Sequence, residues 1–156
     1  MTISNSVDNL QLIAVNAIEI TRLMPFVRAF YHHFDYPYNE EEKASVLRQI
    51  LHDESIGRLW LIRHEGKEVG YVLVAFSFSL ELGGRIAFID ELFIDSSCRK
   101  KGVGAAVLKK AENICLNMGI RAIRLETEPH NQRATDLYAR LGYIDHGRHL
   151  MTKIAE

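Results

Sequence analysis

A turn rich in basic residues and glycine is the part of this 156-residue chain that is best suited to chemistry. A candidate buried strand over residues 86–94 leads towards it, and residues 99–104 then read Arg-Lys-Lys-Gly-Val-Gly before a candidate helix. The first N–H groups of a helix lack intrahelical acceptors, and the helix dipole adds partial positive charge there. Because glycines let a ligand approach the backbone closely, the turn predicts a cradle for a di-anionic ligand beside a strand end.

Three kinds of glycine-rich turn compete for this pattern. A P-loop needs Gly-Lys-Ser/Thr after a four-residue spacer, and the chain has no such run. A dinucleotide fingerprint needs a third Gly or Ala three residues after Gly104, where this chain has Val107. The remaining pattern is Arg-x-x-Gly-x-Gly, although a Gly-x-Gly before a helix is also common in α/β proteins as a packing device. The turn alone leaves both interpretations open.

A second pattern lies downstream, after an apolar strand candidate over residues 120–127. The run from Asn131 to Tyr143 reads NQRATDLYARLGY. The Arg-x-x-Gly-x-Gly turn resembles the pyrophosphate-binding turn of the GCN5-related N-acetyltransferase superfamily. The downstream run is similar to the second signature of that family, Asn-x-x-Ala-x-x-Leu-Tyr-x-x-Leu-Gly-Phe/Tyr, at every specified position. The resemblance covers roughly residue 59 to the C-terminus, and two signatures in the right order favour the family over a packing device.

The resemblance implies acetyl-coenzyme A (acetyl-CoA) as cosubstrate. Backbone N–H groups of residues 100–105 would hold its pyrophosphate, with charge from Arg99 and Lys100. Its pantetheine arm would lie along the main chain of residues 92–94 like an added strand. A bulge at Leu92 would free the N–H of that residue to face the thioester oxygen. The implied cofactor-binding residues are Leu92, Phe93, Ile94, Arg99, Lys100, Lys101, Gly102, Val103, Gly104, Ala105, Asn131 and Tyr138.

Two consecutive acids, Asp90 and Glu91, lie just before the strand end. Neighbouring residues of a regular strand point to opposite faces, so only one of the two can face an acceptor. We favour Glu91 as the general base because its longer side chain suits a water-relayed proton path. The alternatives are Asp90 in that role, or two structural carboxylates with water as the base.

Tyr138 matches the tyrosine of the family whose phenol approaches the thioester sulfur. A phenol pKa near ~10 and a thiol pKa near ~8.5 make full proton transfer to the thiolate uphill by about 2 kcal/mol. A hydrogen bond to the developing thiolate is therefore the implied role, and a core tyrosine on an amphipathic helix is the alternative. Asn131 would contact the amides of the cofactor or cap the following helix. The implied catalytic set is Tyr138, Glu91, Asp90 and Leu92.

The acceptor site has weaker candidates. His32, His33, Phe34, Tyr36 and Tyr38 follow the first candidate helix, where members of the family build the acceptor pocket, and aromatic core filling is the alternative. A carboxylate near the acceptor would favour a cationic amine. The candidate carboxylates, which otherwise read as solvated surface residues, are Glu81, Glu40, Glu41 and Glu42.

Length and composition predict a single domain over residues 1–156 with a sizeable core, since 47% of the residues are apolar. With a formal net charge of −1, the global electrostatics give no argument for a nucleic acid or a membrane surface as partner, and we expect neither. No apolar run approaches the ~18 residues of a spanning helix. Cys98 and Cys115 make no disulfide framework, and no His-x-x-x-His pair occurs. We therefore expect a cytoplasmic protein without a metal site.

The hydrophobic spacing and the turn residues predict the elements that position these groups. Expected strands cover residues 10–15, 59–63, 69–78, 85–94, 120–127, 143–145 and 149–154. A Glu65-Gly66 turn is expected to join the second of these strands to the third as a hairpin. Expected helices cover residues 19–33 and 132–141. A further helix is expected to begin after its cap Asn39, in a unit that ends at Gly57. Another is expected to begin after Gly102 and to run to about residue 117. Gly119 is expected to cap the third helix in a left-handed conformation.

This order matches the layout of the family, so the expected fold class is α/β, a central twisted mixed β-sheet with helices on both faces. The expected activity is transfer of an acetyl group from acetyl-CoA to a primary amine by direct attack in a ternary complex. A small cationic amine is the preferred acceptor, and a protein amine comes second. A non-catalytic acyl-CoA sensor of the same fold is the alternative from another class. The resemblance also implies a homodimer, because the family commonly dimerises.

Overall fold

The computed structural model describes residue 7 and residues 9–99 and 102–155. They divide into two compact units, Met1–Glu126 and Thr127–Glu156. The single domain expected over residues 1–156 stays a prediction.

The strands of the first unit form one five-stranded sheet in the order β1-β2-β3-β4-β5. Neighbours are antiparallel except for β4 and β5, which run parallel. The sheet is therefore mixed, as predicted. The strands are β1 (Leu10–Ala14), β2 (Gly57–His64), β3 (Lys67–Ser79), β4 (Gly84–Ile94) and β5 (Ile123–Leu125).

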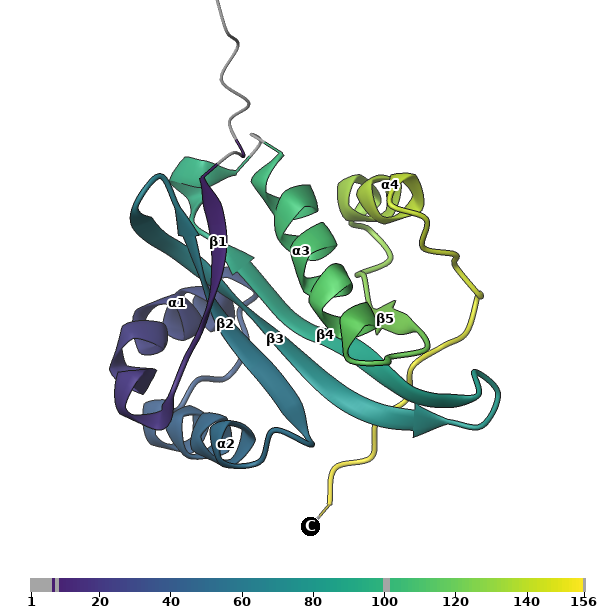
Figure 1. Cartoon of the computed structure of the whole chain (residues 1–156), viewed down its shortest axis with the longest axis horizontal. Coiled ribbons are helices and arrows are strands. Elements are labelled where there is room, and N and C mark those ends of the chain that lie inside the picture. The colour runs from purple at the N-terminus through teal and green to yellow at the C-terminus, as the bar shows by residue number, and fades with distance from the viewer. Residues whose placement is uncertain (1–6, 8, 100–101, 156) are drawn as a thin grey trace, which may run out of the picture. The chain divides into compact units, whose positions relative to one another are not determined.

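Helices cover both faces of this sheet, α1 and α2 on one side and α3 on the other (Figure 1). Their bounds are α1 (Ile20–His33), α2 (Glu40–His52) and α3 (Val103–Asn117), and a fourth helix, α4 (Gln132–Arg140), lies in the second unit. Short 3₁₀ turns occupy Ala17–Glu19 and Ser96–Cys98. The predicted α/β class with helices on both faces is thus confirmed.

The core under α1 and α2 explains why these helices pack where they do. Leu23, Val27 and Phe30 recur on one face of α1, and each is no more than 8% exposed. They pack against alternate residues of β2 and β3, including Leu61 and Tyr71, both fully buried. Each fully buried apolar side chain of this size contributes roughly 1.5–3 kcal/mol. This burial holds α1 against the face of the sheet that carries Tyr71.

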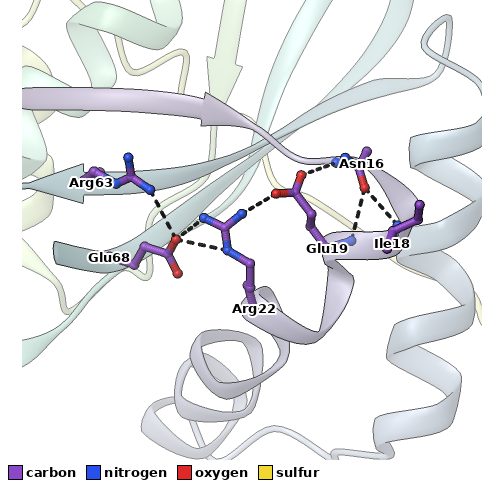
Figure 2. Close-up of polar contacts among 6 residues, drawn as sticks. All are labelled: Asn16, Ile18, Glu19, Arg22, Arg63 and Glu68. Atoms are coloured by element: carbon purple, nitrogen blue, oxygen red, sulfur yellow. Dashed lines mark hydrogen bonds and ion pairs between the residues drawn. The ribbon is translucent and has the colours of Figure 1, made fainter. Parts of the chain in front are cut away.

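A polar network fixes the start of α1 (Figure 2). The side chain of Asn16 accepts hydrogen bonds from the N–H groups of Ile18 (2.9 Å) and Glu19 (3.1 Å), so it caps the 3₁₀ turn before the helix. Arg22, in the first turn of α1, forms ion pairs with Glu19 and with Glu68 at the start of β3. These bonds tie the helix start to the hairpin of β2 and β3.

Other local signals were read correctly from the sequence. The side chain of Asn39 accepts a hydrogen bond from the N–H of Glu42 (2.9 Å) and caps α2. Glu65 and Gly66 join β2 to β3 with φ angles of 50° and 77°, the left-handed pair of a tight hairpin turn. Gly119 ends α3 with φ 81°.

Three expectations about elements are wrong. Residues 143–145 and 149–154 form no strands, although Ile144, Leu150 and Met151 are apolar. A strand needs a partner for its backbone hydrogen bonds, and the described residues of the second unit contain no other strand. The strand expected over residues 120–127 pairs only through β5, which is shorter. Gly57 does not end a helical unit but opens β2, where a Cβ would lie 2.6 Å from the carbonyl oxygen of Val74.

Within the part of the chain that the structure describes, no helix has both the length and the apolar character needed to cross a bilayer. The cytoplasmic location stays a prediction.

Candidate functional site

A β-bulge lies near the end of β4, at the two consecutive acids. Leu73 of β3 pairs with Glu91 and Val74 pairs with Ile89, so Asp90 is an extra residue without a partner on β3. The resemblance implied a bulge at Leu92, and the structure corrects its position to Asp90. The expected regular alternation of Asp90 and Glu91 is also wrong, because the extra residue resets the alternation. Glu91 now shares the face of β4 that α1 covers.

β4 separates from β5 at the same point. Pairing with β5 ends at Ile89, opposite Leu125. The N–H of Asp95 donates to Val69 of β3 (2.7 Å). Since bonding direction alternates along an antiparallel strand, the main chains of Phe93 and Glu91 also face β3, whereas those of Leu92 and Ile94 face the open side. The β4 end, defined here as residues 92–94, thus presents an unpaired strand edge.

The glycine turn begins α3 beside this edge. Gly102 has φ 75°, a left-handed conformation that favours glycine, and it precedes the first helical residue. The first intrahelical hydrogen bond runs from the N–H of Ala106 to the carbonyl of Gly102 (3.1 Å). The N–H groups of Val103, Gly104 and Ala105 therefore have no acceptor within the helix. These three N–H groups and the helix dipole lie where the sequence predicts the anion cradle, and anion binding there stays a prediction.

Gly104, at the start of α3, has space around it for a Cβ. A Cβ at this position would meet only the Cδ1 atom of Ile94, at 3.6 Å, which is ordinary van der Waals contact. Packing within the protein therefore does not require glycine here, although glycine weakens a helix relative to alanine. The same contact shows that the start of α3 lies against the β4 end. A ligand that approaches the backbone at Gly104 would explain the missing side chain.

Arg99 lies between the two elements. Its Nε donates to the carbonyl of Ile94 (2.7 Å), and its guanidinium lies 5.3 Å from the ring centre of Phe93. Among the described residues, no carboxylate lies within ion-pair distance of Arg99. Its charge thus remains available at the start of α3. Lys100 and Lys101, also predicted to bind the anion, lie outside the described residues.

The carboxylate of Glu91 is held by two tyrosines that sequence analysis did not single out. The hydroxyl of Tyr31 in α1 donates to Oε1, and the hydroxyl of Tyr71 in β3 donates to Oε2. Both oxygen–oxygen distances are 2.7 Å. A signal for Tyr71 was present in the sequence, because a tyrosine inside an otherwise apolar strand needs a polar partner for its hydroxyl. Tyr31 carried no comparable signal, since only the fold brings α1 to β4.

The electrostatic surroundings raise the pKa of Glu91. Burial is the main cause and the nearby charge of Asp90 adds to it, while the phenols of Tyr71 and Tyr31 and the ammonium of Lys43 act in the opposite direction. Burial also raises the pKa of Asp90, although its side chain keeps contact with solvent. Both tyrosines have raised pKa values, because burial and the charge of Glu91 disfavour a phenolate.

An aromatic cluster surrounds Tyr31 at the end of α1 and in the segment before α2. Its ring contacts join Tyr31 to Phe30, Tyr36 and Tyr38, and Phe34 stacks on Tyr36 with ring centres 5.5 Å apart. Phe34 and Tyr36 are 37% and 44% exposed, so the cluster is not only core filling. The ammonium of Lys43 in α2 lies 5.0 Å from the ring centre of Tyr31. The rings therefore already accommodate a primary ammonium group.

The predicted carboxylates near the acceptor are less well placed. Glu40 pairs with Arg28 and Glu42 with Lys43. Glu81 lies 3.7 Å from Arg124 at the far end of the β3–β4 hairpin. Glu41 is exposed in the first turn of α2. Within the described ranges, no group of three or more His, Cys, Asp and Glu side chains is arranged to hold a metal ion.

The second unit carries the other signature residues. The side chain of Asn131 accepts a hydrogen bond from the N–H of Ala134 (3.1 Å), which is the capping role that the sequence left open. Tyr138 lies on α4, with its ring centre 5.8 Å from that of Tyr143. Burial raises the pKa of the Tyr138 phenol. The predicted contacts of Asn131 and Tyr138 with a cofactor stay predictions.

Comparison with known proteins gives a consistent assignment. The sequence profile described as "Acetyltransferase (GNAT) family" matches residues 22–143. The solved structure of an integron cassette protein, HFX_CASS3, from the mobile metagenome of Cole Harbour Salt Marsh superposes with a TM-score of 0.83 at 25% sequence identity. That superposition covers 100% of this chain and 96% of the other.

Two curated relatives add sequence similarity. The uncharacterized N-acetyltransferase YhfO of Bacillus subtilis (strain 168) is 27% identical over 128 residues, which are 82% of this chain and 83% of YhfO. The thialysine N-epsilon-acetyltransferase of Bos taurus is 35% identical over 77 residues, which are 49% of this chain. That match covers 45% of the bovine protein, so it spans less than half the length of this relative.

Proposed function

The chain belongs to the acetyltransferase (GNAT) family, whose cosubstrate is acetyl-CoA, and we propose that it acetylates a small cationic primary amine by direct attack in a ternary complex. One observation carries the proposal. Three features follow one another within residues 91–105. They are the carboxylate of Glu91, the open edge of the β4 end and the free N–H groups at the start of α3.

Binding of the cosubstrate falls to the main chain. The N–H groups of Val103, Gly104 and Ala105 would hold the diphosphate, with charge from Arg99. The main-chain groups of Leu92 and the N–H of Ile94 would pair with the amides of the pantetheine arm, as in an added strand. When bound, the cosubstrate supplies an acetyl thioester whose carbon accepts the amine and whose sulfur leaves. The N–H of Leu92 would stabilise the charge that develops on the carbonyl oxygen.

Glu91 is the proposed general base. A primary amine enters as an ammonium ion at neutral pH and must lose a proton before its nitrogen can attack. Glu91 would receive that proton through water, and its raised pKa brings the carboxylate closer to the working pH of a base. The N–C bond then forms and the C–S bond breaks. The nitrogen gives up a second proton, which neutralises the departing thiolate to the CoA thiol. Asp90, which is exposed at the bulge, is the alternative base.

The aromatic cluster supports a cationic acceptor. Phe34 and Tyr36 are its exposed rings, and Tyr31 lies close enough to the carboxyl groups of Glu91 and Asp90 to feel their charge. Tyrosine faces also attract ammonium groups. The name of the bovine relative, a thialysine N-epsilon-acetyltransferase, describes a primary amine on a flexible chain. Together they support an acceptor with a terminal ammonium group.

Tyr138 is the proposed donor to the departing sulfur. Its pKa lies above the ordinary phenol value because of burial, so complete proton transfer to a thiolate is less favourable than in water. A hydrogen bond that stabilises the developing charge is the role consistent with this direction.

A panel of amines tests the proposal. Purified full-length protein is mixed with acetyl-CoA and with thialysine, lysine, polyamines, aminoglycosides, neutral amines or peptides, and release of CoA thiol is followed with a thiol reagent. We expect thiol release with small cationic amines, at rates that rise with acceptor concentration and saturate.

Each other outcome has a distinct meaning. Turnover only with peptides would assign a protein N-acetyltransferase. Binding of acetyl-CoA without thiol release from any amine would assign an acyl-CoA sensor. Failure to bind acetyl-CoA would refute the placement of the cosubstrate. The homodimer and the lack of nucleic-acid partners stay predictions.

A further inference from the structure

We propose that the hydroxyls of Tyr31 and Tyr71, here called the phenol clamp, position the carboxylate of Glu91 for its role as base. The inference rests on the proposed function, because only that function gives Glu91 a proton to receive. The two tyrosines are positioning residues in this account, since they act on the acceptor through Glu91.

The geometry of the clamp uses both oxygens of one carboxylate. Oε1 accepts from Tyr31 of α1 and Oε2 from Tyr71 of β3, both at 2.7 Å, which is the short range of charge-assisted hydrogen bonds. Two donors from different elements leave the carboxylate one orientation. Each oxygen keeps a further lone pair, so the carboxylate can still accept a proton from water.

Burial indicates that the Tyr71 hydroxyl is present for Glu91. Tyr71 is fully buried and packs among apolar residues of α1 and β3. A phenylalanine ring would fill the same space, whereas a buried hydroxyl is unfavourable unless it is hydrogen-bonded. The Tyr71 hydroxyl donates its hydrogen bond to Oε2 of Glu91. The sequence therefore places a polar group in the core at the one point where it reaches the bulge.

The bulge at Asp90 makes the contact possible. If β4 ran regularly through Asp90, Leu73 would pair with Asp90, and alternation would turn Glu91 to the opposite face of β4, away from Tyr71. With it, Glu91 and Tyr71 share the face that α1 covers. One irregularity thus opens the strand edge for a ligand and aims the carboxylate at the clamp.

Charged and titratable groups approach Glu91 from every element packed against it. Tyr31 faces it from α1, Tyr71 from β3 and Asp90 from β4. Lys43 acts on it from α2, and Glu42 of the same helix acts on Tyr31. Burial and Asp90 raise the pKa of Glu91, whereas the two phenols and Lys43 lower it. Removing either hydroxyl must therefore raise that pKa further.

The consequence for the pH profile has a definite sign. The base acts as a carboxylate, so kcat/KM rises as the pH rises through the pKa of Glu91. Loss of one phenol donor moves this acid limb to higher pH. Hydrogen bonds to charged groups are strong enough to shift it by about 1 pH unit or more. A purely structural loss would lower the rate at every pH without moving the limb.

The experiment compares Tyr71→Phe, Tyr31→Phe and Tyr38→Phe in the full chain. Tyr38 is the matched control because its hydroxyl contacts Glu40 (3.4 Å) instead of Glu91. We expect the acid limb of kcat/KM to move up by about 1 pH unit in the first two variants, and to keep its position in the third. In a Glu91→Gln background the Tyr71 substitution should cause no further shift.

A second measurement keeps the inference testable if the variants are slow. The carboxyl ¹³C shift of Glu91 is titrated by NMR in each variant, and thermal unfolding checks that each one folds. We expect its midpoint to rise in Tyr71→Phe and Tyr31→Phe only. An unchanged midpoint, or a shifted midpoint with an unchanged acid limb, would overturn the inference. A wild-type protein that acetylates no amine would instead refute the proposed function.

Discussion

Glu91 meets two opposing demands within one side chain. Partial burial disfavours its charged form, and two phenols and a lysine favour it, with a net rise in pKa. A base needs a carboxylate that is available near neutral pH but still basic enough to take a proton. The local structure at Asp90 and Glu91 therefore matters more for the chemistry than the identity of the acids alone.

Replacement of Glu91 by Gln should separate activity from stability. The raised pKa means that the folded state binds this proton more tightly than the unfolded state, whose glutamate pKa is about 4.3. Ionisation of Glu91 thus removes stability as the pH rises through its folded-state pKa. We expect Glu91→Gln to lower kcat/KM by about 100-fold. We also expect the Tm of this variant, relative to that of wild type, to increase as the pH rises from about 4 to 8.

Thermal unfolding of both proteins across this pH range provides the check. A variant that becomes less stable than wild type towards pH 8 would mean that the phenol hydrogen bonds outweigh the cost of burial.

Tyr138 gives the second prediction at this scale. Removal of its hydroxyl should lower kcat by about tenfold or more, because a donor to the departing sulfur acts only in the transition state. The dissociation constant for acetyl-CoA should stay nearly unchanged. Stopped-time thiol assays and calorimetry measure the two quantities, with Tyr143→Phe as a control from the same unit. Unchanged kcat would remove Tyr138 from the mechanism.

At the scale of elements, the junction of the β4 end and α3 is the feature that matters most. Gly104→Ala should keep or raise Tm, since its Cβ finds ordinary contact with Ile94 and alanine favours a helix. The same Cβ would occupy the path of a ligand to the backbone. We expect the dissociation constant for acetyl-CoA to rise by about tenfold, equivalent to 1.4 kcal/mol. Gly104→Glu, which adds a like charge, should abolish binding.

Gly70 supplies the matched contrast on the other side of the β4 end. A Cβ there would fall on the main-chain oxygen of Phe93 and lie 2.9 Å from its carbonyl carbon. Gly70→Ala should therefore destabilise the fold, by roughly 1–3 kcal/mol for an overpacked site. Calorimetry measures the dissociation constant for acetyl-CoA, and thermal unfolding measures Tm, for both Gly104→Ala and Gly70→Ala. A Gly104→Ala protein that binds acetyl-CoA as tightly as wild type would place the ligand elsewhere.

Element types and most bounds followed from local signals in the sequence. Apolar spacing predicted α1 and α2, Asn39 and Gly119 marked helix ends, and the Glu65-Gly66 turn marked a hairpin. The bulge at Asp90 was misplaced because an extra residue is defined by the residues opposite it on β3, Leu73 and Val74, which are 17 and 16 positions away. The role of Tyr31 could not be predicted for the same reason, since its contact with Glu91 spans 60 positions of the sequence.

At the scale of the whole molecule, the end of the chain is the part that the sequence described least well. Apolar residues near the C-terminus indicated strands, yet Ile144, Leu150 and Ile154 are at least 71% exposed, and the described residues there form no strand. A periodic pattern gives a strand only where another strand pairs with it. The sheet of the first unit was predictable because its hairpins join neighbours in sequence.

Hydrogen exchange of the free protein tests this description. Amides of residues 143–155 should exchange quickly, because no strand pairing protects them. Amides of residues 71–74 in β3, which lie between β2 and β4, should be among the slowest. Protection of residues 149–154 comparable to that of β3 would show that closing strands form in solution.

The central claim is that acetyl-CoA lies along the β4 end with its diphosphate at the start of α3. The most direct measurement is a titration of ¹⁵N-labelled protein with acetyl-CoA, followed residue by residue in amide NMR spectra. The account predicts large amide shift changes at Leu92, Ile94, Val103, Gly104 and Ala105. It predicts small amide shift changes in β1, which forms the edge of the sheet away from β4 and β5. Saturation without changes at these five amides would contradict it.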